Sequence, residues 1–371
     1  MSIKEKTAIV LLAYADYESL ELTLAAYATF IKNDEKLFIL QNGRGTYDCE
    51  RTYRVAKRYA SLYPRNIEVV DDIPQGYPYY SIKSLLASER MQKYDYICKV
   101  DDDCFPLTRT WFDDLCTCYE DSAKTYGDSL GYVTSLVNNN PWGFDKILDI
   151  FEKREEFFDI YAREHRGGGK GYGTERIYGK NEIHTGCCGT VWGNAYISRW
   201  VHRFSTMAPE EYVQRTANLG YAEVDNTKRY SINCMLFRKE FWNAIDMDSH
   251  DDEHQCFMYC KENDKKIIAN MSIPMVHLMF FIQREENRTL IPEIKRIYDS
   301  FLNSVYPISI CDDKLYEIEN RLRHIETILS QKENFDTVEY YKNKILSKIC
   351  FGSRRKYYKE KYRKMKKLLR H

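Results

Sequence analysis

Short apolar runs alternate with longer stretches of helical periodicity over the first 140 residues. The apolar runs cover 7–14, 36–42, 66–70, 94–100 and 130–137, and they are rich in β-branched and aromatic residues, as strands are. Between them, apolar residues recur at helical spacing over 19–33, 47–63, 79–92 and 108–122. Strands and helices in alternation predict an α/β fold with a mostly parallel central sheet flanked by helices.

Polar residues follow four of these predicted strands directly. In a parallel sheet the carboxyl ends of the strands share one edge, and ligands collect there. We therefore expect four polar clusters along that edge: Tyr14-Ala15-Asp16, Gln41-Asn42-Gly43, Asp71-Asp72 and Asp101-Asp102-Asp103.

The pattern is less regular in the middle of the chain. Residues 143–165 are predicted to be helical. The glycine-rich stretch 166–182 is either a plain loop or a lid that orders over substrate, and it lacks the Ser or Thr that follows the lysine of a P-loop. Residues 186–200 predict a turn that leads into a helix. Acidic residues open a predicted helix within 249–263, and 265–281 predicts a strand that contains His277.

The C-terminal part has a different character. Alternating spacings of three and four predict a helix at 312–330 that forms a homodimer or packs back on the body, through Leu315, Ile318, Leu322, Ile325 and Leu329. Residues 344–371 hold 12 Lys and Arg against one Glu, which leaves 43 basic and 54 acidic residues in the rest of the chain. Aromatic and aliphatic residues interleave with these cations, which favours peripheral contact with an anionic membrane over a solvated tail or nucleic acid.

The cysteines and apolar segments bear on the compartment. Twelve cysteines are scattered over 371 residues, often inside apolar runs, as Cys98 and Cys234 are. The close pairs Cys116/Cys118 and Cys256/Cys260 have no second pair at matching spacing, which favours reduced, buried thiols over zinc or disulfides. No apolar segment reaches about eighteen residues, and no cleavage site follows the first apolar run. We expect a cytoplasmic protein or one peripheral on the inner face of the membrane.

Three adjacent carboxylates at Asp101, Asp102 and Asp103 repel one another and resist losing water. A hard divalent cation, Mg²⁺ or Mn²⁺, would offset that repulsion with oxygen ligands and complete its shell with substrate phosphates. An acidic loop without function is one alternative. An aspartyl phosphatase is another, but its carboxylate pair normally follows the first strand.

The order of these features resembles family 2-type glycosyltransferases of the GT-A fold, of the bacterial surface-polysaccharide type. The family's D-x-D motif corresponds to Asp101-Asp102-Asp103 after YDYICKV, and NIEVVDDIPQGYPYYSIKSLL is similar to the segment before it, with Ser81 or Lys83 in place of the usual asparagine. An acidic pair at a helix start corresponds to Asp251-Asp252, and a late histidine to His277. The resemblance covers about residues 5–290.

This resemblance implies a function and an organisation. It implies a metal-dependent, inverting transfer of a sugar from a nucleotide-diphosphate sugar, UDP- before GDP-, to a hydroxyl of a glycan or lipid-linked acceptor. A glycosyltransferase domain would span 1–310, with a nucleotide-sugar-binding half at 1–140 and an acceptor half at 141–310, followed by a helical, basic extension at 311–371. A sugar nucleotidyltransferase and a non-catalytic glycan-binding scaffold on the same fold are the alternatives.

The resemblance also implies roles for individual residues. Asp101, Asp103 and His277 would hold Mn²⁺ or Mg²⁺, and Asp252 would be the catalytic base, with Asp251 and then Glu253 as substitutes. A satisfied buried histidine and an ordinary helix N-cap are the structural alternatives for His277 and the acidic pair. Gly186, Cys187 and Trp192 would face the acceptor. The donor-binding candidates are Ala13, Tyr14, Asp16, Asn42, Asp72, Lys83, Asp101, Asp102, Arg284 and Arg288.

Overall fold

The computed structural model describes residues 2–43, 45–164, 195–226, 230, 232–245, 251–279 and 287–305. The chain divides into two units, Met1–Lys57 with Arg65–Val305, and Arg58–Pro64 with Tyr306–His371. The strands and the candidate site belong to the first unit. The glycine-rich stretch 166–182, the predicted pairing helix 312–330 and the basic segment 344–371 lie outside the described residues.

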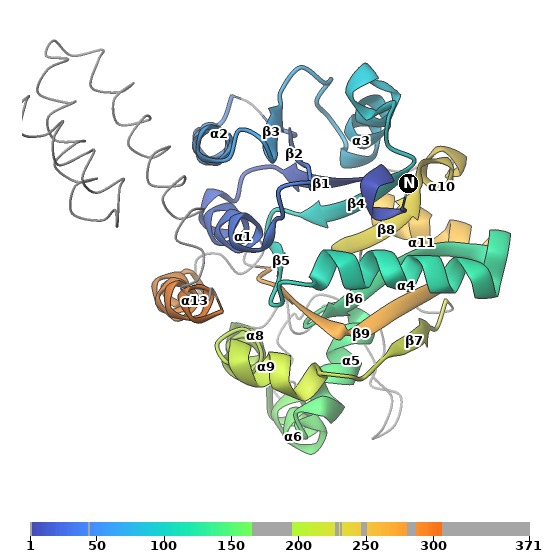
Figure 1. The fold of residues 1–371 in the computed structure, drawn as a ribbon. Helices are drawn as coiled ribbons and strands as arrows, with labels where there is room; N and C mark the ends of the chain where they lie inside the picture. The colour runs from blue at the N-terminus through green and yellow to red at the C-terminus, as the bar shows by residue number, and fades with distance from the viewer. Residues whose placement is uncertain are drawn as a thin grey trace, which may run out of the picture. The chain divides into compact units, whose positions relative to one another are not determined.

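One mixed sheet holds the strands of the described residues (Figure 1). They are β1 (Thr7–Ala13), β2 (Leu37–Gln41), β3 (Ile67–Val70), β4 (Tyr96–Asp101), β5 (Cys104–Pro106), β6 (Leu130–Val137), β7 (Tyr221–Val224), β8 (Cys234–Arg238) and β9 (Lys266–His277). The order is β3-β2-β1-β4-β8-β6-β9-β5, and β7 also pairs with β9. Strands β1, β2, β3, β4, β6 and β9 run in one direction, and β5, β7 and β8 in the other. The predicted α/β class and mostly parallel sheet are confirmed.

The four predicted N-terminal helices are present as α1 (Tyr17–Phe30), α2 (Tyr47–Leu62), α3 (Pro78–Ala87) and α4 (Trp111–Tyr126). The predicted helical segment 143–165 is two helices, α5 (Pro141–Ile150) and α6 (Arg154–Glu164). Between them Glu152 has a positive φ of 57°, a backbone conformation that no α-helix contains. The later helices are α8 (Ala195–Phe204), α9 (Pro209–Thr216), α10 (Lys239–Ala244), α11 (Asp252–Glu262) and α13 (Ile291–Ser304).

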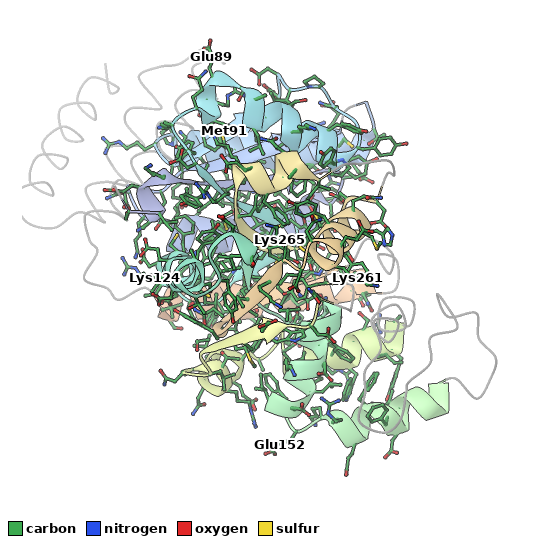
Figure 2. All side chains as sticks on the ribbon, turned by 90° about the vertical axis from the view of Figure 1, so that its right-hand side faces the viewer. Glu89, Met91, Lys124, Glu152, Lys261 and Lys265 are labelled. Carbon is green, nitrogen blue, oxygen red and sulfur yellow. The ribbon has the colours of Figure 1, made fainter. Side chains whose placement is uncertain are left out.

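Helices cover both faces of the sheet, because successive strand residues point to opposite faces. Ala8 and Val10 of β1 belong to a core cluster that also contains Ile82 of α3, Trp242 of α10 and Cys260 of α11. Helix α4 packs against β6 and β9 and crosses in front of them in Figure 1. Figure 2 shows the side where β9 begins, with Lys265 labelled between α11 and that strand.

The register between β1 and β4 decides which side chains meet at the carboxyl edge of the sheet. Val10 lies opposite Lys99, and Leu12 lies opposite Asp101. Lys99 and Asp101 therefore point to the face that α3, α10 and α11 cover. The N-terminus of α11, which carries the acidic pair, lies over this same face.

The cysteines of the described residues are free and buried: Cys49, Cys98, Cys104, Cys116, Cys118, Cys234, Cys256 and Cys260. Burial raises the pKa of the Cys116 and Cys118 thiols to about 12. These thiols therefore stay protonated and act as small apolar groups in the core. Among the described residues, no helix is both long and apolar enough to cross a membrane.

The Trp242 side chain is the main contact between α10 and α3, and its removal tests this packing. Its ring is fully buried and lies 5.5 Å from the rings of both Tyr79 and Phe237, measured between centroids. Trp242→Ala is expected to lower the free energy of unfolding by about 3–5 kcal/mol in urea titrations. Leu219→Ala, at a position 40% exposed, is the control and should change it by less than about 0.5 kcal/mol. Equal stability of the two variants would contradict the packing described.

Candidate metal and active site

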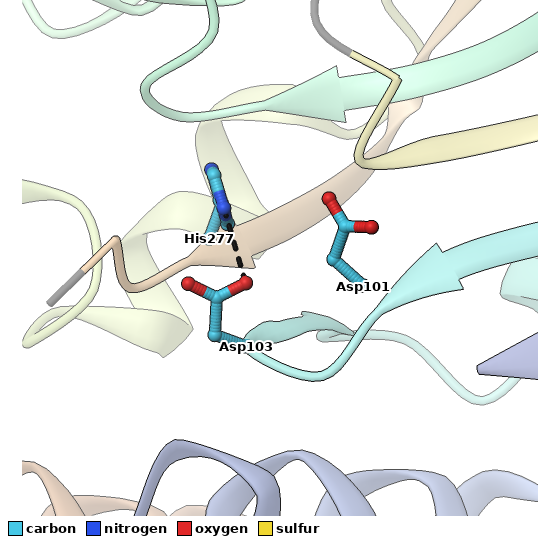
Figure 3. Close-up of side chains that lie close together, drawn as sticks. All are labelled: Asp101, Asp103 and His277. Atoms are coloured by element: carbon cyan, nitrogen blue, oxygen red, sulfur yellow. Dashed lines mark ion pairs between the residues drawn. The ribbon is translucent and has the colours of Figure 1, made fainter. Parts of the chain in front are cut away.

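Two carboxylates and an imidazole meet at the carboxyl edge of the sheet (Figure 3). Asp101 ends β4, Asp103 lies in the turn to β5, and His277 ends β9. One possible ligand atom from each lies within 4.8 Å of those of the other two. The antiparallel pairing of β5 with β9 sets Cys104 opposite His277, and this brings the imidazole Nε2 to 3.1 Å from Asp103 Oδ1.

Asn139 fixes the orientation of the His277 ring. Its side-chain nitrogen donates to the His277 carbonyl oxygen at 2.5 Å, so its oxygen faces the ring and lies 2.8 Å from Nδ1. Nδ1 then carries a hydrogen, and Nε2 is the ring nitrogen that faces the carboxylates. Metal-binding histidines are commonly held in this way by a partner on the other nitrogen.

Asp103 and His277 are a buried acid and a buried base in direct contact. Burial opposes the charged form of both groups, but each stabilises the charge of the other. The net effect holds the pKa of Asp103 below its usual value and raises the pKa of His277 above its own. The Met279 N–H also donates to Asp103 Oδ2 at 3.0 Å and so favours the carboxylate.

A buried lysine compensates the other carboxylate. Lys99 is 2% exposed, and its ammonium donates to Asp101 Oδ1 at 2.5 Å and to the Ile232 carbonyl at 2.8 Å. Burial alone would lower the pKa of Lys99, but the charges of Asp101 and Asp252 raise it above its usual value. Lys99 therefore stays cationic, and its ammonium lies against the Asp101 carboxylate.

Asn233 is another side chain in contact with this cluster. Its nitrogen Nδ2 lies 3.0 Å from Asp101 Oδ2 and 3.3 Å from His277 Nε2. Its oxygen Oδ1 is buried and has no hydrogen-bond partner among the described residues.

The donor set fits a divalent cation. Carboxylate oxygens are ligands of both Mg²⁺ and Mn²⁺, and the imidazole nitrogen favours the transition metal. Ligand atoms of the three side chains lie within 4.8 Å of one another, and a cation would displace the proton between Asp103 and His277 Nε2. Asp101, Asp103 and His277 are the residues that would hold the ion.

Asp102, between the two candidate ligands, has a different environment. It accepts a hydrogen bond from the Tyr14 backbone N–H at 2.9 Å, which ties the end of β1 to the end of β4. Burial and the charge of Asp103 raise the pKa of Asp102 well above its usual range. Among the described residues, Asp102 is not part of the group formed by Asp101, Asp103 and His277. Its hydrogen bond to Tyr14 is a structural contact.

The two members of the acidic pair on α11 have separate positions. Asp251 caps the helix, because its side chain accepts from the His254 N–H at 2.9 Å. Asp252, the next residue, is partly buried. Burial raises the pKa of Asp252, the charge of Lys99 opposes this rise, and the charge of Asp101 adds to it. Asp252 thus lies within electrostatic reach of the cluster.

Several donor-binding candidates near the ends of β1 to β3 form hydrogen bonds within the protein. Ala13 is buried, and Asp16 caps α1 through Ser19. Asn42 donates to the Gly76 carbonyl at 2.9 Å, and Lys83 donates to the Tyr79 hydroxyl at 3.3 Å.

The carboxylates after β3 also differ from each other. Asp72 forms a bidentate pair with Arg90, at 2.7 and 2.8 Å. Asp71 pairs with Lys57 at 2.9 Å and accepts from the Tyr53 hydroxyl at 2.7 Å. It also lines a cavity of about 380 Å³ at the ends of β2 and β3, together with Gln41, Gly43, Glu50 and Tyr53. Of the two, Asp71 is the one with access to a ligand there.

Several candidate residues have no described position. Gly186, Cys187, Trp192 and Arg284 lie outside the described residues. Arg288 begins the short 3₁₀ helix Arg288–Leu290, and its side chain is not among those described.

The site also contains residues that were not predicted from the sequence: Lys99, Asn138, Asn139 and Asn233. Asn138 accepts from the His277 backbone N–H at 2.9 Å through its side-chain oxygen. Asn138 and Asn139 belong to NNN, which directly follows the strand at 130–137. That position at a strand end is the same signal that selected the aspartates. Lys99 was visible as a charged residue inside a predicted buried strand.

No family model and no curated protein matches the sequence. One solved structure with a similar backbone trace is the mannosyltransferase PcManGT from Pyrobaculum calidifontis in complex with GDP-Man and Mn²⁺. It is 9% identical in sequence, with a TM-score of 0.38, and the match covers 95% of this chain and 83% of that one. Another is S. aureus TarS 1–349, at 11% identity and a TM-score of 0.35, over 98% and 91%. Similarity at this level does not transfer a fold or a chemistry, so the argument for function rests on the residues of the site.

Removing a candidate ligand should weaken Mn²⁺ binding, because the remaining groups leave part of the coordination shell empty. Asp103→Asn and His277→Gln are each expected to weaken it at least about ten-fold, measured from the electron paramagnetic resonance signal of free Mn²⁺. Asp72→Asn removes an exposed carboxylate from its pair with Arg90 and should leave the affinity unchanged. A wild-type affinity in both ligand variants would remove these residues from the metal site.

Proposed function

We propose that this protein is a metal-dependent, inverting glycosyltransferase that moves a sugar from a nucleotide-diphosphate sugar to a hydroxyl of a glycan or lipid-linked acceptor. The observation that carries the proposal is the meeting of Asp101, Asp103 and His277 at the carboxyl edge of the sheet. Ligands of α/β sheets bind at this edge, and a cation there suits a diphosphate.

The donor would lie along the ends of β1 to β4. The cavity lined by Gln41, Tyr53 and Asp71 has about 380 Å³, within the range of small-molecule sites. It would take the nucleoside, while the diphosphate extends toward Asp101 and Asp103. The Tyr14–Asp102 hydrogen bond joins the two regions, since it connects the ends of β1 and β4. A UDP-sugar is the first candidate donor and a GDP-sugar the second.

The leaving group is the second requirement of glycosyl transfer. A divalent ion held by Asp101, Asp103 and His277 would supply Lewis-acid stabilisation of the charge that develops on the departing diphosphate. Lys99 holds the Asp101 side chain in place through its 2.5 Å contact, and Asn139 holds the His277 ring with Nε2 toward the carboxylates. These supporting contacts reduce the reorganisation that binding requires.

Asp252 is the proposed base. It would take the proton of the acceptor hydroxyl while the acceptor oxygen bonds to the anomeric carbon and the bond to the diphosphate breaks on the opposite face, which inverts the configuration. Burial raises the pKa of Asp252, and a carboxylate of higher pKa is the better proton acceptor. Asp251 is a weaker candidate because its side chain caps α11.

The sequence of the C-terminal segment supports a lipid-linked acceptor. The cationic and aromatic residues of 344–371 support contact with an anionic membrane surface, where a lipid-linked acceptor would be found. The proposed compartment is therefore the cytoplasm or the inner face of the membrane.

Asp252→Asn is expected to slow sugar transfer by at least about 100-fold, because the amide cannot accept the proton. Asp251→Asn is the matched control, since asparagine also caps helices well and should preserve both α11 and the activity. The measurement is release of nucleoside diphosphate from a panel of UDP- and GDP-sugars with Mn²⁺, alongside calorimetric binding of the same nucleotides.

Asp252→Asn should keep its nucleotide affinity while it loses turnover. Loss of nucleotide binding in this variant would take Asp252 out of the base role. Release of sugar 1-phosphate and a nucleoside triphosphate when pyrophosphate is added, instead of nucleoside diphosphate, would identify a nucleotidyltransferase, and the absence of turnover with every donor would favour a glycan-binding scaffold.

A further inference from the structure

The Asn233 side chain occupies an unusual position beside the candidate metal ligands. The residue is 6% exposed, and its backbone carbonyl accepts from the Asp101 N–H at 3.1 Å, which fixes it directly before β8. Its Nδ2 lies 3.0 Å from Asp101 Oδ2 and 3.3 Å from His277 Nε2. A hydrogen-bond donor thus faces the two atoms that a cation would contact.

The two ends of this amide are not equally satisfied. Nδ2 has two partners, whereas Oδ1 is buried without a hydrogen-bond partner among the described residues. A buried carbonyl oxygen without a partner is costly, and no hydrogen bond at Oδ1 holds the amide in this orientation. A cation beside Asp101 and His277 would repel the Nδ2 hydrogens and attract the free oxygen.

We propose that Asn233 is a fourth protein ligand of the metal site, with its side-chain oxygen Oδ1 turned toward the cation. Rotation about the bond between Cβ and Cγ exchanges oxygen and nitrogen within nearly the same shape. Amide carbonyls are good ligands of hard cations. The amide adds an oxygen ligand without adding a third negative charge to those of Asp101 and Asp103. The inference rests on the metal dependence of the proposed function but not on glycosyl transfer.

The alternative role for Asn233 is that of a hydrogen-bond donor that positions Asp101 and His277, and the two roles need opposite ends of the amide. Asn233→Asp keeps an oxygen and removes the donor, whereas Asn233→Leu removes both at similar volume. A ligand role predicts that Asn233→Asp binds Mn²⁺ at least as tightly as the wild type and that Asn233→Leu binds at least about ten-fold more weakly. A donor role predicts that both variants bind more weakly.

The experiment titrates Mn²⁺ into the full-length chain and measures free Mn²⁺ by electron paramagnetic resonance, with thermal unfolding as a second readout. Asn233→Asp should also gain more thermal stability from Mn²⁺ than the wild type, because the ion offsets an added buried carboxylate. Asn263→Asp adds the same charge at the exposed end of α11 and should behave as the wild type does.

Weaker binding in Asn233→Asp, or unchanged binding in Asn233→Leu, would overturn the ligand role. If Asn233→Leu does not fold, Asn233→Asp alone still separates the two roles. If the wild type itself binds no Mn²⁺, the metal dependence of the proposed function fails, and with it this inference. A metal site that functions without sugar transfer would leave the assignment of Asn233 intact.

Discussion

Asp101 and Asp103 repel each other and lose water on burial, and the surrounding chain is arranged to offset this cost. Lys99 neutralises Asp101 from within the same strand, since residues two apart point to one face. His277 and the Met279 N–H stabilise Asp103 from the end of β9. The cluster is thus stable without an ion, yet its atoms are those that an ion would take over.

The sheet topology explains why so many polar side chains meet here. Strands β1, β4, β6 and β9 run in the same direction and end at the same edge. Asp101 and His277 are the last residues of β4 and β9, and Tyr14 and Asn138 directly follow β1 and β6. Strand β5 reverses against β9 and brings Asp103 to the histidine. Helix α11 then places Asp252 over the face to which Lys99 and Asp101 point. A metal-assisted transfer needs a cation-binding site and a base at such an edge, and both come from elements that pack on the core.

The sequence predicted the parallel half of the fold because its strands are apolar runs separated by helical periodicity. It missed β5, β7 and β8: the first two are three and four residues long, too short for a period, and β8 is followed at once by α10. Asp101 and Asp103 could be selected because they follow a predicted strand. His277 lies inside the predicted strand 265–281 and could be selected only through the resemblance to the glycosyltransferase family. Asn233 could not, since its contact with Asp101 arises from the register of β8 on β4, across more than 130 residues. Asp251 and Asp252 have different environments, and so do Asp71 and Asp72. These differences depend on the direction of each side chain, which the sequence of adjacent aspartates does not reveal.

The proposed site requires that this cluster binds a cation together with a nucleoside diphosphate. We would titrate UDP and GDP calorimetrically into the full-length protein, once with Mn²⁺ and once with a chelator. One of the two nucleotides is expected to bind with Mn²⁺ and to lose its binding with the chelator. Equal binding under both conditions, or no binding of either nucleotide, would rule out the proposed site.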